Sequence, residues 1–357
     1  MANTHAPTPK GSGVPSADVL EPINGEAAGK HLLSMRQLTS SDVADYMREA
    51  YAAEALRDSE RRGIPLLQHA VMKAVMRQPS TRTGGSCTTA MQKLGGSADL
   101  ISGMSGSSEA KGESITDSWV AFATQADILG IRTAEDEGPK IAALAIAKAV
   151  SDGGLPRLVP VINLGDGKNE HPTQALGDLF TIHKRFKTLD GLNLVMVGDQ
   201  ERYRAFHSLL IGAVTMGMHV VAVESVAAPV PRRLVDEAGG NLEVTRDLDG
   251  AMAEADVLYV GRNPDEYEGD DPVEKQRGAQ LAEDFREWSV DYERIQKMRP
   301  DSIVMHPRPR RNELNPDIDS DPRAADVGQM FNMIPMRMAI IARHLGASIA
   351  HAVAKAD

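Results

Sequence analysis

Short apolar runs, each long enough for a buried strand, recur along the chain and are separated by helix-length segments. The first half carries them at residues 70–76, 98–101, 128–132 and 159–163, and the second half at 192–197, 219–223, 257–260 and 303–305. Strands that alternate with helices are typical of parallel sheets. We therefore predict an α/β protein with two lobes, each a parallel sheet flanked by helices, and a cleft between them.

The lobe boundaries follow from where this alternation starts and pauses. Residues 1–29 hold almost no bulky apolar side chains and are expected to form a disordered tail. We expect the first lobe to cover residues 30–172 and the second to cover 173–331. The segment 262–280, dense in Asp, Glu, Pro and Gly, is predicted to be a mobile surface loop near the mouth of the cleft.

Composition narrows the class of protein. Apolar residues make up 42% of the 357 residues and charged residues 25%, as in an ordinary globular protein, and the formal charge of -11 argues against nucleic acid or an anionic membrane surface as a partner. The single cysteine, Cys87, excludes a disulfide framework and is expected to pack in the core. The chain has no apolar run of about 18 residues and no signal-peptide pattern at its N-terminus, so we expect a cytoplasmic protein without a membrane span.

The segment Pro79–Ser86 follows the first predicted strand and precedes a helix expected at 87–94. A helix N-terminus presents unpaired backbone N–H groups and the positive end of a dipole, so an anion can bind there, held also by Arg82 and the neighbouring hydroxyl groups. The alternative is an ordinary Ser/Thr helix cap beside a solvated arginine. The segment alone does not decide between the two.

Further polar groups follow other predicted strands. Arg132, His171, Arg262 and His306 each come shortly after one. A lone histidine is usually structural and a lone arginine is usually solvated, but with Arg82 five such groups all lie at strand ends. They predict a pocket rich in fixed positive charge, in which the histidines are the groups able to change protonation near neutral pH.

A dinucleotide site is not expected at the end of the strand 192–197. The strand leads into Val197-Gly198-Asp199, but bulky side chains follow at residues 200–204. A pyrophosphate needs glycines there for close backbone approach.

Four motifs occur in an order and spacing that resemble the aspartate/ornithine carbamoyltransferase family. They are Ser80-Thr81-Arg82-Thr83, Lys111-Gly112-Glu113-Ser114, His171-Pro172-Thr173-Gln174-Ala175-Leu176 and His306-Pro307-x-Pro309-Arg310. The aspartate branch is the closer match, because Gly165-Asp166-Gly167, Asp178-Leu179-Phe180-Thr181-Ile182 and Asp321-Pro322-Arg323-Ala324-Ala325 also look like it. The resemblance implies a carbamoyl-phosphate lobe completed by a C-terminal helix at 332–355, and an acceptor lobe. It also implies a homotrimer whose active sites are shared between subunits.

The resemblance assigns roles residue by residue. Phosphate binding is implied for Ser80, Thr81, Arg82, Thr83 and Arg132, with Ser107 and Lys111 from a neighbouring subunit. Thr83, Arg132 and His171 are implied to polarise the carbamoyl carbonyl group, and Gln174 with the backbone carbonyls of Pro307 and Arg308 to hold the carbamoyl NH2. Arg204 and Arg262 are implied to bind acceptor carboxylates. This chemistry relies on positioning and electrostatics and calls for no metal or organic cofactor.

The sequence departs from the family pattern on both sides of the expected site. The family has Arg-x-Ser-Phe-Glu where this chain has Gly84-Gly85-Ser86-Cys87-Thr88, and Val-Gln where it has Asn263-Pro264. Tyr203 replaces a glycine, and Arg308 replaces a leucine and is expected to contact the acceptor.

Three functions stay open at this point. The first is carbamoyl transfer from carbamoyl phosphate to aspartate or an aspartate-like carboxylate. The second is another reaction on a related carboxylate or ureido substrate, and the third is a non-catalytic, ligand-binding paralogue. The acceptor, any regulatory chain, assembly beyond a trimer, and a role in pyrimidine synthesis or in a specialised pathway also stay open.

Overall fold

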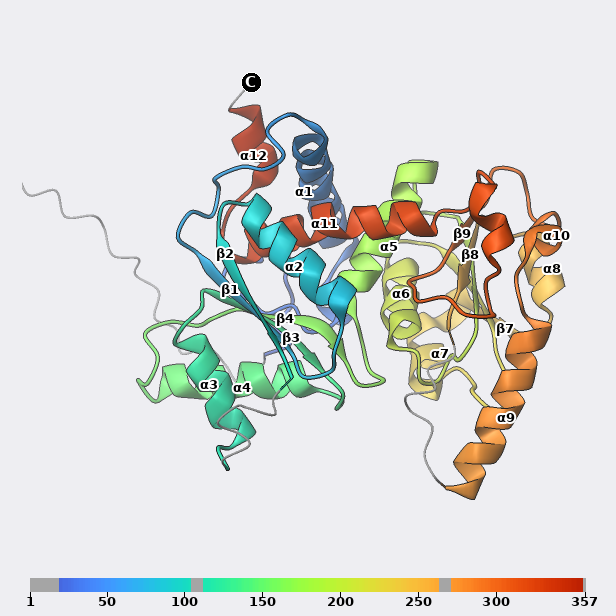
Figure 1. The fold of residues 1–357 in the computed structure, drawn as a ribbon, viewed down its shortest axis with the longest axis horizontal. Coiled ribbons are helices and arrows are strands. Elements are labelled where there is room, and N and C mark those ends of the chain that lie inside the picture. The colour runs from blue at the N-terminus through green and yellow to red at the C-terminus, as the bar shows by residue number, and fades with distance from the viewer. Residues whose placement is uncertain (1–18, 104–111, 263–270, 356–357) are drawn as a thin grey trace, which may run out of the picture.

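The computed structural model describes residues 19–103, 112–262 and 271–355, which form two lobes (Figure 1). The sheet of the first lobe has the order β2-β1-β3-β4, and its strands are all parallel. These strands are β1 (Val71–Met76), β2 (Ser97–Ser102), β3 (Ile128–Thr133) and β4 (Val161–Asp166). The prediction of two parallel sheets flanked by helices is confirmed.

The second lobe contains a parallel sheet of order β7-β6-β5-β8-β9. Its strands are β5 (Asn193–Val197), β6 (His219–Val223), β7 (Leu242–Thr245), β8 (Val257–Val260) and β9 (Ile303–Met305). β7 was not predicted from the sequence, because this four-residue edge strand has no fully buried side chain and lacks the apolar run that marks the other strands.

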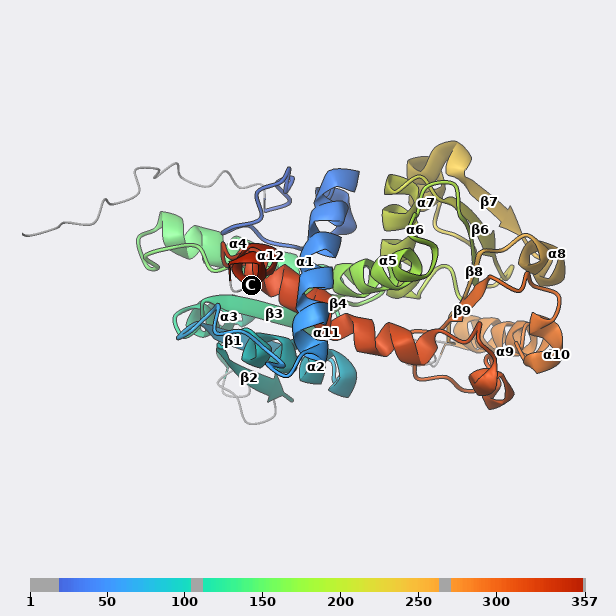
Figure 2. The ribbon, with the colours of Figure 1, turned by 90° about the horizontal axis from the view of Figure 1, so that it is seen from above.

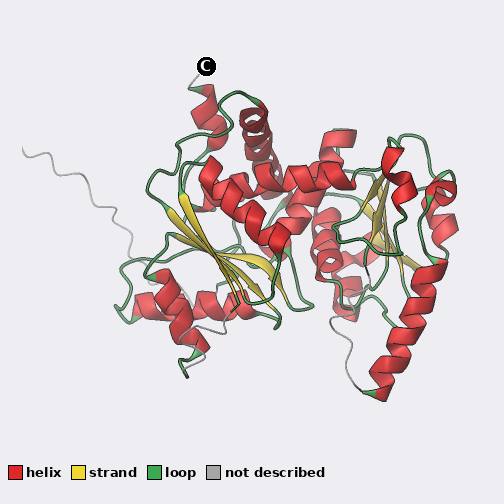
Figure 3. Cartoon of the chain, viewed as in Figure 1, coloured by secondary structure: helices red, strands yellow, loops and turns green. Residues whose placement is uncertain are grey.

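Helices cover both faces of each sheet (Figure 3). Val75 of β1 packs in the cluster with α3 and α4, whereas Ala74 and Met76 pack in the cluster with α1 and α2, because successive strand side chains point to opposite faces. The helices of the first lobe are α1 (Ser40–Asp58), α2 (Thr81–Lys93), α3 (Ile115–Ala123) and α4 (Gly138–Ser151). Those of the second are α6 (Arg204–Thr215), α7 (Arg232–Ala238), α8 (Leu248–Ala253), α9 (Pro272–Glu287) and α10 (Tyr292–Ile295). Short 3-10 helices occur at Met35–Gln37, Gly239–Asn241 and Pro316–Ser320.

Two long helices join the lobes. α5 (Pro172–Phe186) leads from β4 to the second sheet, and α11 (Asp326–His344) crosses back from β9 to pack on α1, α2 and α5 (Figure 2). Gly177 permits this contact, because a Cβ atom there would lie 2.2 Å from Cε of Met333 on α11. The structure therefore has one hydrophobic cluster that runs through both lobes.

The predicted C-terminal helix 332–355 is two helices in the structure. α11 begins six residues earlier, and Gly346, with φ of +73°, separates it from α12 (Ile349–Ala354). α12 packs against α1. Within the described residues, no helix is long and apolar enough to cross a membrane.

The predicted disordered tail is wrong for its last part. Ile23 is fully buried in the main cluster, its N–H group donates to the carbonyl of Gln37 at 2.9 Å, and Gly29 donates to the carbonyl of His344 at 3.0 Å. This segment has few apolar side chains, but it is ordered because one of them packs in the hydrophobic core and its backbone forms hydrogen bonds to the folded protein. Residues 1–18 lie outside the described part of the chain.

The predicted loop at 262–280 is also wrong from residue 271 onward. Residues 263–270 lie outside the described residues, but α9 starts at Pro272. Asp271 caps α9, because its side chain accepts from the N–H of Val273 at 2.7 Å, and Pro272 suits the first helical position. Acidic residues and proline therefore marked a helix start rather than a loop.

Candidate active site

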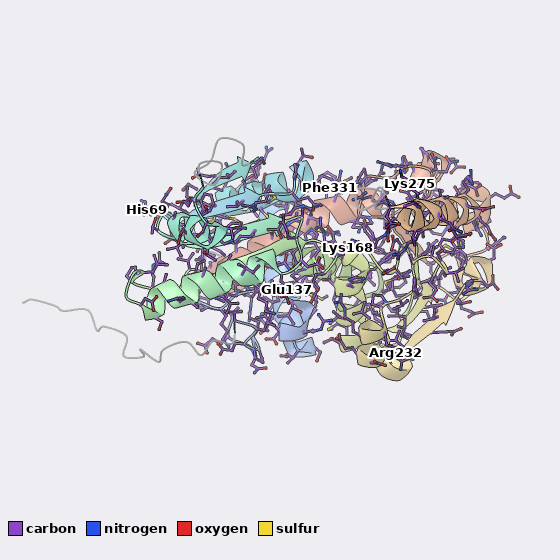
Figure 4. The ribbon with its side chains drawn as sticks, turned by 90° about the horizontal axis from the view of Figure 1, so that it is seen from below. His69, Glu137, Lys168, Arg232, Lys275 and Phe331 are labelled. Carbon is purple, nitrogen blue, oxygen red and sulfur yellow. The ribbon has the colours of Figure 1, made fainter. Side chains whose placement is uncertain are left out.

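A cleft lies between the lobes, on the side where the strands of both sheets end. Its cavity volume is about 230 Å³, and α11 forms one wall with Met330, Met333, Ile334 and Arg337. In Figure 4, Lys168 just after β4 and Phe331 on α11 lie in the middle of the molecule, where the lobes meet. The remaining lining residues are Ser80, Arg82, Thr83, Ser86, Arg132, His171, Gln174, Arg202, Tyr203, Arg204, Ala205, Arg262, Pro307, Arg308, Pro309 and Gln329.

The N-terminus of α2 opens toward the cleft. Ser80 is the N-cap, and its side chain accepts from the N–H of Thr83 at 3.4 Å. α2 begins at Thr81 rather than at residue 87 as predicted, and its first turn carries no acidic residue. Thr83 and Arg82 line the cleft, whereas Thr81 is exposed and outside the lining. The arrangement presents the positive end of a helix to an anion.

Arg82 connects the two lobes. Its Nη2 donates to the backbone carbonyl of Arg308 at 2.6 Å. Burial lowers the pKa of Arg82 from its usual value, and the cations Arg262 and Arg308 lower it further. Arg308 pairs with the buried carboxylate of Asp326, so it lines the cleft with its charge compensated.

His306 lies behind the cleft wall, contrary to the expectation that it titrates inside the pocket. It is fully buried, and its Nδ1 accepts from the N–H of Arg308 at 2.8 Å. Its Nε2 then donates to Glu313 at 2.9 Å. Burial lowers the pKa of His306, so the imidazole is neutral and holds the 306–308 loop in place.

His171 lies in the cleft at the start of α5. Its backbone N–H donates to Oγ of Ser208 at 2.8 Å, which fixes the helix start against α6. Burial and then the cations Arg132, Arg204 and Arg337 hold its pKa well below the usual range. His171 is therefore a neutral imidazole at physiological pH, which can donate or accept a hydrogen bond but has no proton to release as an imidazolium.

Gly165 separates two of the predicted arginines. It follows the middle of β4 with φ of +111°, and a Cβ atom there would lie 2.9 Å from Nη1 of Arg132 and 3.0 Å from Nε of Arg204. Arg204 donates to the carbonyl of Gly167 at 3.0 Å and to Oε1 of Gln78 at 2.6 Å. The absence of a side chain at Gly165 lets both guanidinium groups reach one cleft.

Two aromatic side chains, Tyr203 and Phe206, pack next to Arg262 on the second lobe. Cζ of Arg262 lies 5.9 Å from the ring centre of Tyr203, which packs edge-on against Phe206 at 5.1 Å. A Cβ atom at Gly261 would lie 2.3 Å from Phe206, so glycine is needed for this close packing. Tyr203 is thus a packed part of the cleft wall beside Arg204, and its ring does not project into the cleft as an unsupported side chain.

A buried network orients Gln174. Its Nε2 donates to Asp178 at 2.9 Å, and Asp178 also accepts from Gln329 at 2.7 Å and from the hydroxyl of Tyr259 at 2.7 Å. Burial raises the pKa of Asp178 to about 7, although these donors oppose the rise. Since Nε2 of Gln174 is engaged, its amide oxygen is left to accept a hydrogen bond.

Ser86, Arg202 and Arg337 line the cleft but were not predicted as site residues. Arg337 donates to Oγ of Ser86, and Arg202 pairs with Asp199 at 2.6 Å. The available signal for Arg337 was a single cation in the apolar run 333–342. Ser107 and Lys111 lie outside the described residues, so the structure does not place them.

The charged side chains in the described lining of the cleft are all cationic, and two of them, Arg202 and Arg308, pair with the buried carboxylates of Asp199 and Asp326 behind the lining. The described residues that line it include seven arginines and no aspartate or glutamate. Elsewhere in residues 19–103, 112–262 and 271–355, no three His, Cys, Asp or Glu side chains lie close enough to hold a metal ion. The site is therefore built for anionic molecules.

Comparisons with known proteins match both lobes. Residues 30–184 match the model of the aspartate/ornithine carbamoyltransferase carbamoyl-phosphate-binding domain, and residues 190–343 match that of the aspartate/ornithine-binding domain. The aspartate carbamoyltransferase catalytic subunit of Thermoplasma volcanium is 34% identical over 82% of this chain and 90% of its own length. That of Thermococcus gammatolerans is 31% identical over 89% of this chain and 98% of its own length.

Solved structures agree with these matches. Aspartate transcarbamoylase from Trypanosoma cruzi in complex with carbamoyl phosphate and aspartate has a TM-score of 0.80 and 30% identity over 91% of this chain and 99% of its own. Ornithine carbamoyltransferase from Pyrococcus furiosus has a TM-score of 0.77 at 24% identity over 90% of this chain and 98% of its own, which shows a shared fold.

Proposed function

The chain belongs to the aspartate/ornithine carbamoyltransferase family, and from that premise we propose that it transfers the carbamoyl group of carbamoyl phosphate to the amine of aspartate or of an aspartate-like carboxylate. One observation carries the proposal: the N-terminus of α2, Arg82, Arg132 and His171 meet in a single cleft whose described lining holds no carboxylate. Such a lining suits one dianionic phosphate and one carboxylate-bearing amine.

The phosphate is assigned to the first-lobe side of the cleft. Ser80, Thr81 and Thr83 surround the helix N-terminus, and Arg82 and Arg132 supply fixed positive charge. Ser107 and Lys111 are proposed to join them from a neighbouring subunit of a cytoplasmic homotrimer. This arrangement stabilises the charge that the phosphate gains as it leaves.

The carbamoyl group is assigned to the centre of the cleft. Thr83, Arg132 and neutral His171 polarise its carbonyl oxygen and stabilise the oxyanion that forms on attack. The amide oxygen of Gln174 and the backbone carbonyls of Pro307 and Arg308 accept from its NH2. The Asp178 network acts through Gln174 and is a positioning element.

The acceptor is assigned to the second-lobe side. Arg204 and Arg262 bind its carboxylates, and Arg308 contributes the part of its guanidinium that does not pair with Asp326. The uncharged amine attacks the carbamoyl carbon, the carbonyl π electrons move to oxygen, and the tetrahedral intermediate then collapses. The C–O bond to phosphate breaks, and phosphate leaves with the amine proton. Orientation of the two substrates in one cleft supplies much of the rate.

Two measurements test this proposal. Millimolar carbamoyl phosphate should raise the thermal midpoint of unfolding of the purified chain, since a ligand that binds only the folded state stabilises it. Carbamoyl phosphate with a panel of amino acids should then give phosphate release and a matching ureido product by mass. A midpoint that does not move, together with phosphate release no faster than in buffer for every amine, would rule out carbamoyl transfer.

A further inference from the structure

One face of α6 contacts the segment that leads into α5. Arg204 donates to a backbone carbonyl of this segment at 3.0 Å, and Oγ of Ser208 accepts from the backbone N–H of His171 at 2.8 Å. Between these two contacts lies His207, which is 1% exposed and has its Nδ1 2.9 Å from the carbonyl oxygen of Asn169. The three side chains of α6 share one side of the helix, because residues three and four positions apart lie on one face. The start of α6 therefore positions His171 as well as Arg204.

The second ring nitrogen of His207 faces another backbone carbonyl. Its Nε2 lies 2.9 Å from the carbonyl oxygen of Gln200, on the loop that leads from β5 to Arg204. The ring is thus held between two carbonyl oxygens, which can only accept hydrogen bonds. A neutral imidazole has one N–H and can donate to one of them, whereas an imidazolium donates to both. The number of hydrogen bonds that His207 makes therefore depends on its protonation.

Two other buried histidines have partners that suit a neutral ring. His344 directs Nδ1 to the carbonyl of Lys30 and Nε2 to the hydroxyl of Tyr46, both at 2.8 Å, and a hydroxyl group can donate. His306 accepts from a backbone N–H at Nδ1 and donates from Nε2. Neither carbonyl beside His207 can donate, so the neutral ring turns a nitrogen lone pair toward a carbonyl oxygen. That contact is unfavourable in a buried site.

The surroundings of His207 act on its protonation in both directions. Burial lowers the pKa of the ring from its usual value, the two carbonyls raise it, Arg233 of α7 lowers it and Asp199 of the β5–α6 loop raises it. On the segment before α5, the buried carboxylate of Glu170 pairs with Arg36 instead. The ring of His207 is therefore neutral above its pKa and gains the second N–H as pH falls.

We propose that His207 is a positioning residue for the acceptor: it joins the segment that carries His171 to the loop that leads to Arg204, and it joins them through both carbonyls only as an imidazolium. This inference rests on the proposed function and adds a pH-dependent control of acceptor affinity to it. When the second bond is absent, one of the two carbonyls loses its donor, and the spacing between His171 and Arg204 is less firmly fixed. KM for the acceptor is then higher.

Amide variants of His207 in the full-length chain test the inference. The side-chain NH2 of asparagine can replace the N–H at Nδ1 and that of glutamine the N–H at Nε2, so His207→Asn and His207→Gln each keep one bond and do not titrate. KM and kcat for L-aspartate are measured with saturating carbamoyl phosphate between about pH 5 and pH 8.5. The ratio of variant KM to wild-type KM should be near 1 at the alkaline end and should rise to about 5 at the acidic end, the effect of one hydrogen bond.

The pH dependence of this ratio separates positioning from a purely structural role. Ionisation of the substrates is the same for every protein and cancels in the ratio, whereas a structural defect would change the ratio equally at every pH. His344→Gln is the matched control, because His344 is also buried but lies outside the cleft lining and has partners for a neutral ring. Its KM ratio should not depend on pH.

NMR of the wild-type chain gives a readout that needs no folded variant. With ¹³C in the histidine rings, the ring signal that is missing from His207→Asn should titrate over the pH range in which the KM ratio changes. If that variant does not fold, the signal is assigned from His207→Gln.

Other outcomes overturn the inference. A KM ratio that is constant or falls toward acidic pH, or a His207 ring that does not titrate between about pH 5 and pH 8.5, would make His207 a structural residue only. Either result would leave the proposed function standing, because aspartate would still be carbamoylated. If the wild-type chain carbamoylates no amine at any pH and does not bind carbamoyl phosphate, the proposed function itself fails.

Discussion

The two sides of the cleft are built in different ways. On the first lobe, the anion site is the backbone end of one helix, α2, with Arg82 and Thr83 from that helix and Arg132 from the neighbouring strand. On the second lobe, the arginines come from the start of α6 and from the loops before α6, after β8 and after β9, and they depend on the packing of Tyr203 and on buried carboxylates. A site made from backbone depends little on its neighbours, whereas a site made from supported side chains can change specificity when its supports change.

Removal of Arg82 should lower enzymatic activity more than any other substitution considered for the two sides of the cleft. Arg82→Ala removes a fixed charge from the phosphate side and its bond to the carbonyl of Arg308, so kcat/KM should fall about 10³-fold, the upper range for one stabilising donor. The stabilisation by carbamoyl phosphate in thermal unfolding should also be reduced. Arg157→Ala, at an exposed arginine outside the cleft, is the control. A fall below 10-fold would show that the helix end alone binds the phosphate.

A side chain at Gly165 should cause the second-largest loss of activity, because it displaces one arginine from each side of the cleft. Gly165→Ala places a methyl group against Arg132 and Arg204, so kcat/KM should fall about 100-fold, as expected for a displacement of about 1 Å. Gly153→Ala is matched to it, because Gly153 also has positive φ, +77°, but nothing lies within 4 Å of the new methyl group. Gly153→Ala should lose stability through backbone strain alone, whereas Gly165→Ala should lose more, because its methyl group also displaces the two arginines. Equal activity in the two variants would contradict a role for Gly165 in arginine placement.

The buried Asp178 gives a pH-dependent effect of intermediate size. Its pKa is raised from 3.8 to about 7 in the folded state, so the stability it contributes is present below pH 4 and is lost as pH rises through 7. Relative to Asp178→Asn, the wild-type free energy of unfolding should fall by about 2 kcal/mol between pH 5.5 and 7, at about 1.4 kcal/mol per pH unit. Chemical denaturation of both proteins at the two pH values measures this. Parallel profiles would mean that the carboxyl is ionised throughout.

The smallest effect is expected at Arg308. Replacement by leucine alone would leave Asp326 buried without its partner, so the informative variant is Arg308→Leu/Asp326→Asn. It should lower kcat/KM for L-aspartate by up to about 10-fold, because the acceptor carboxylates lose one charge contact. Asp326→Asn alone is the control. An unchanged kcat/KM for aspartate would remove Arg308 from the residues that bind the acceptor.

Site residues that lie together in short motifs could be predicted from the sequence, whereas a residue brought in by tertiary packing could not. Arg82 and Thr83 lie side by side in one short motif, and His171 and Gln174 lie three residues apart in another, so local motifs located all four. Arg337 was missed because it comes from a helix more than 150 residues further on, and only the packing of α11 on α2 brings it to Ser86.

Errors in the sequence analysis also have physical causes. His306 follows a strand, like the other site residues, but the turn after β9 directs its ring toward Glu313 in the interior instead of into the cleft. Residues 19–29 were expected to be disordered because their composition does not reveal the hydrophobic cluster of the folded protein in which Ile23 is buried. Lobe architecture was predictable, since it needs only the order of strands and helices.

Isotope transfer shows directly whether the chain moves a carbamoyl group from carbamoyl phosphate to aspartate. The chain is incubated with carbamoyl phosphate labelled with ¹³C at the carbonyl carbon and with L-aspartate, and the label is followed by NMR and mass spectrometry. The label should appear in an N-carbamoyl product at a rate that Arg82→Ala lowers about 10³-fold. Label that appears only in the breakdown products of carbamoyl phosphate, at the rate seen in buffer, would contradict this transfer.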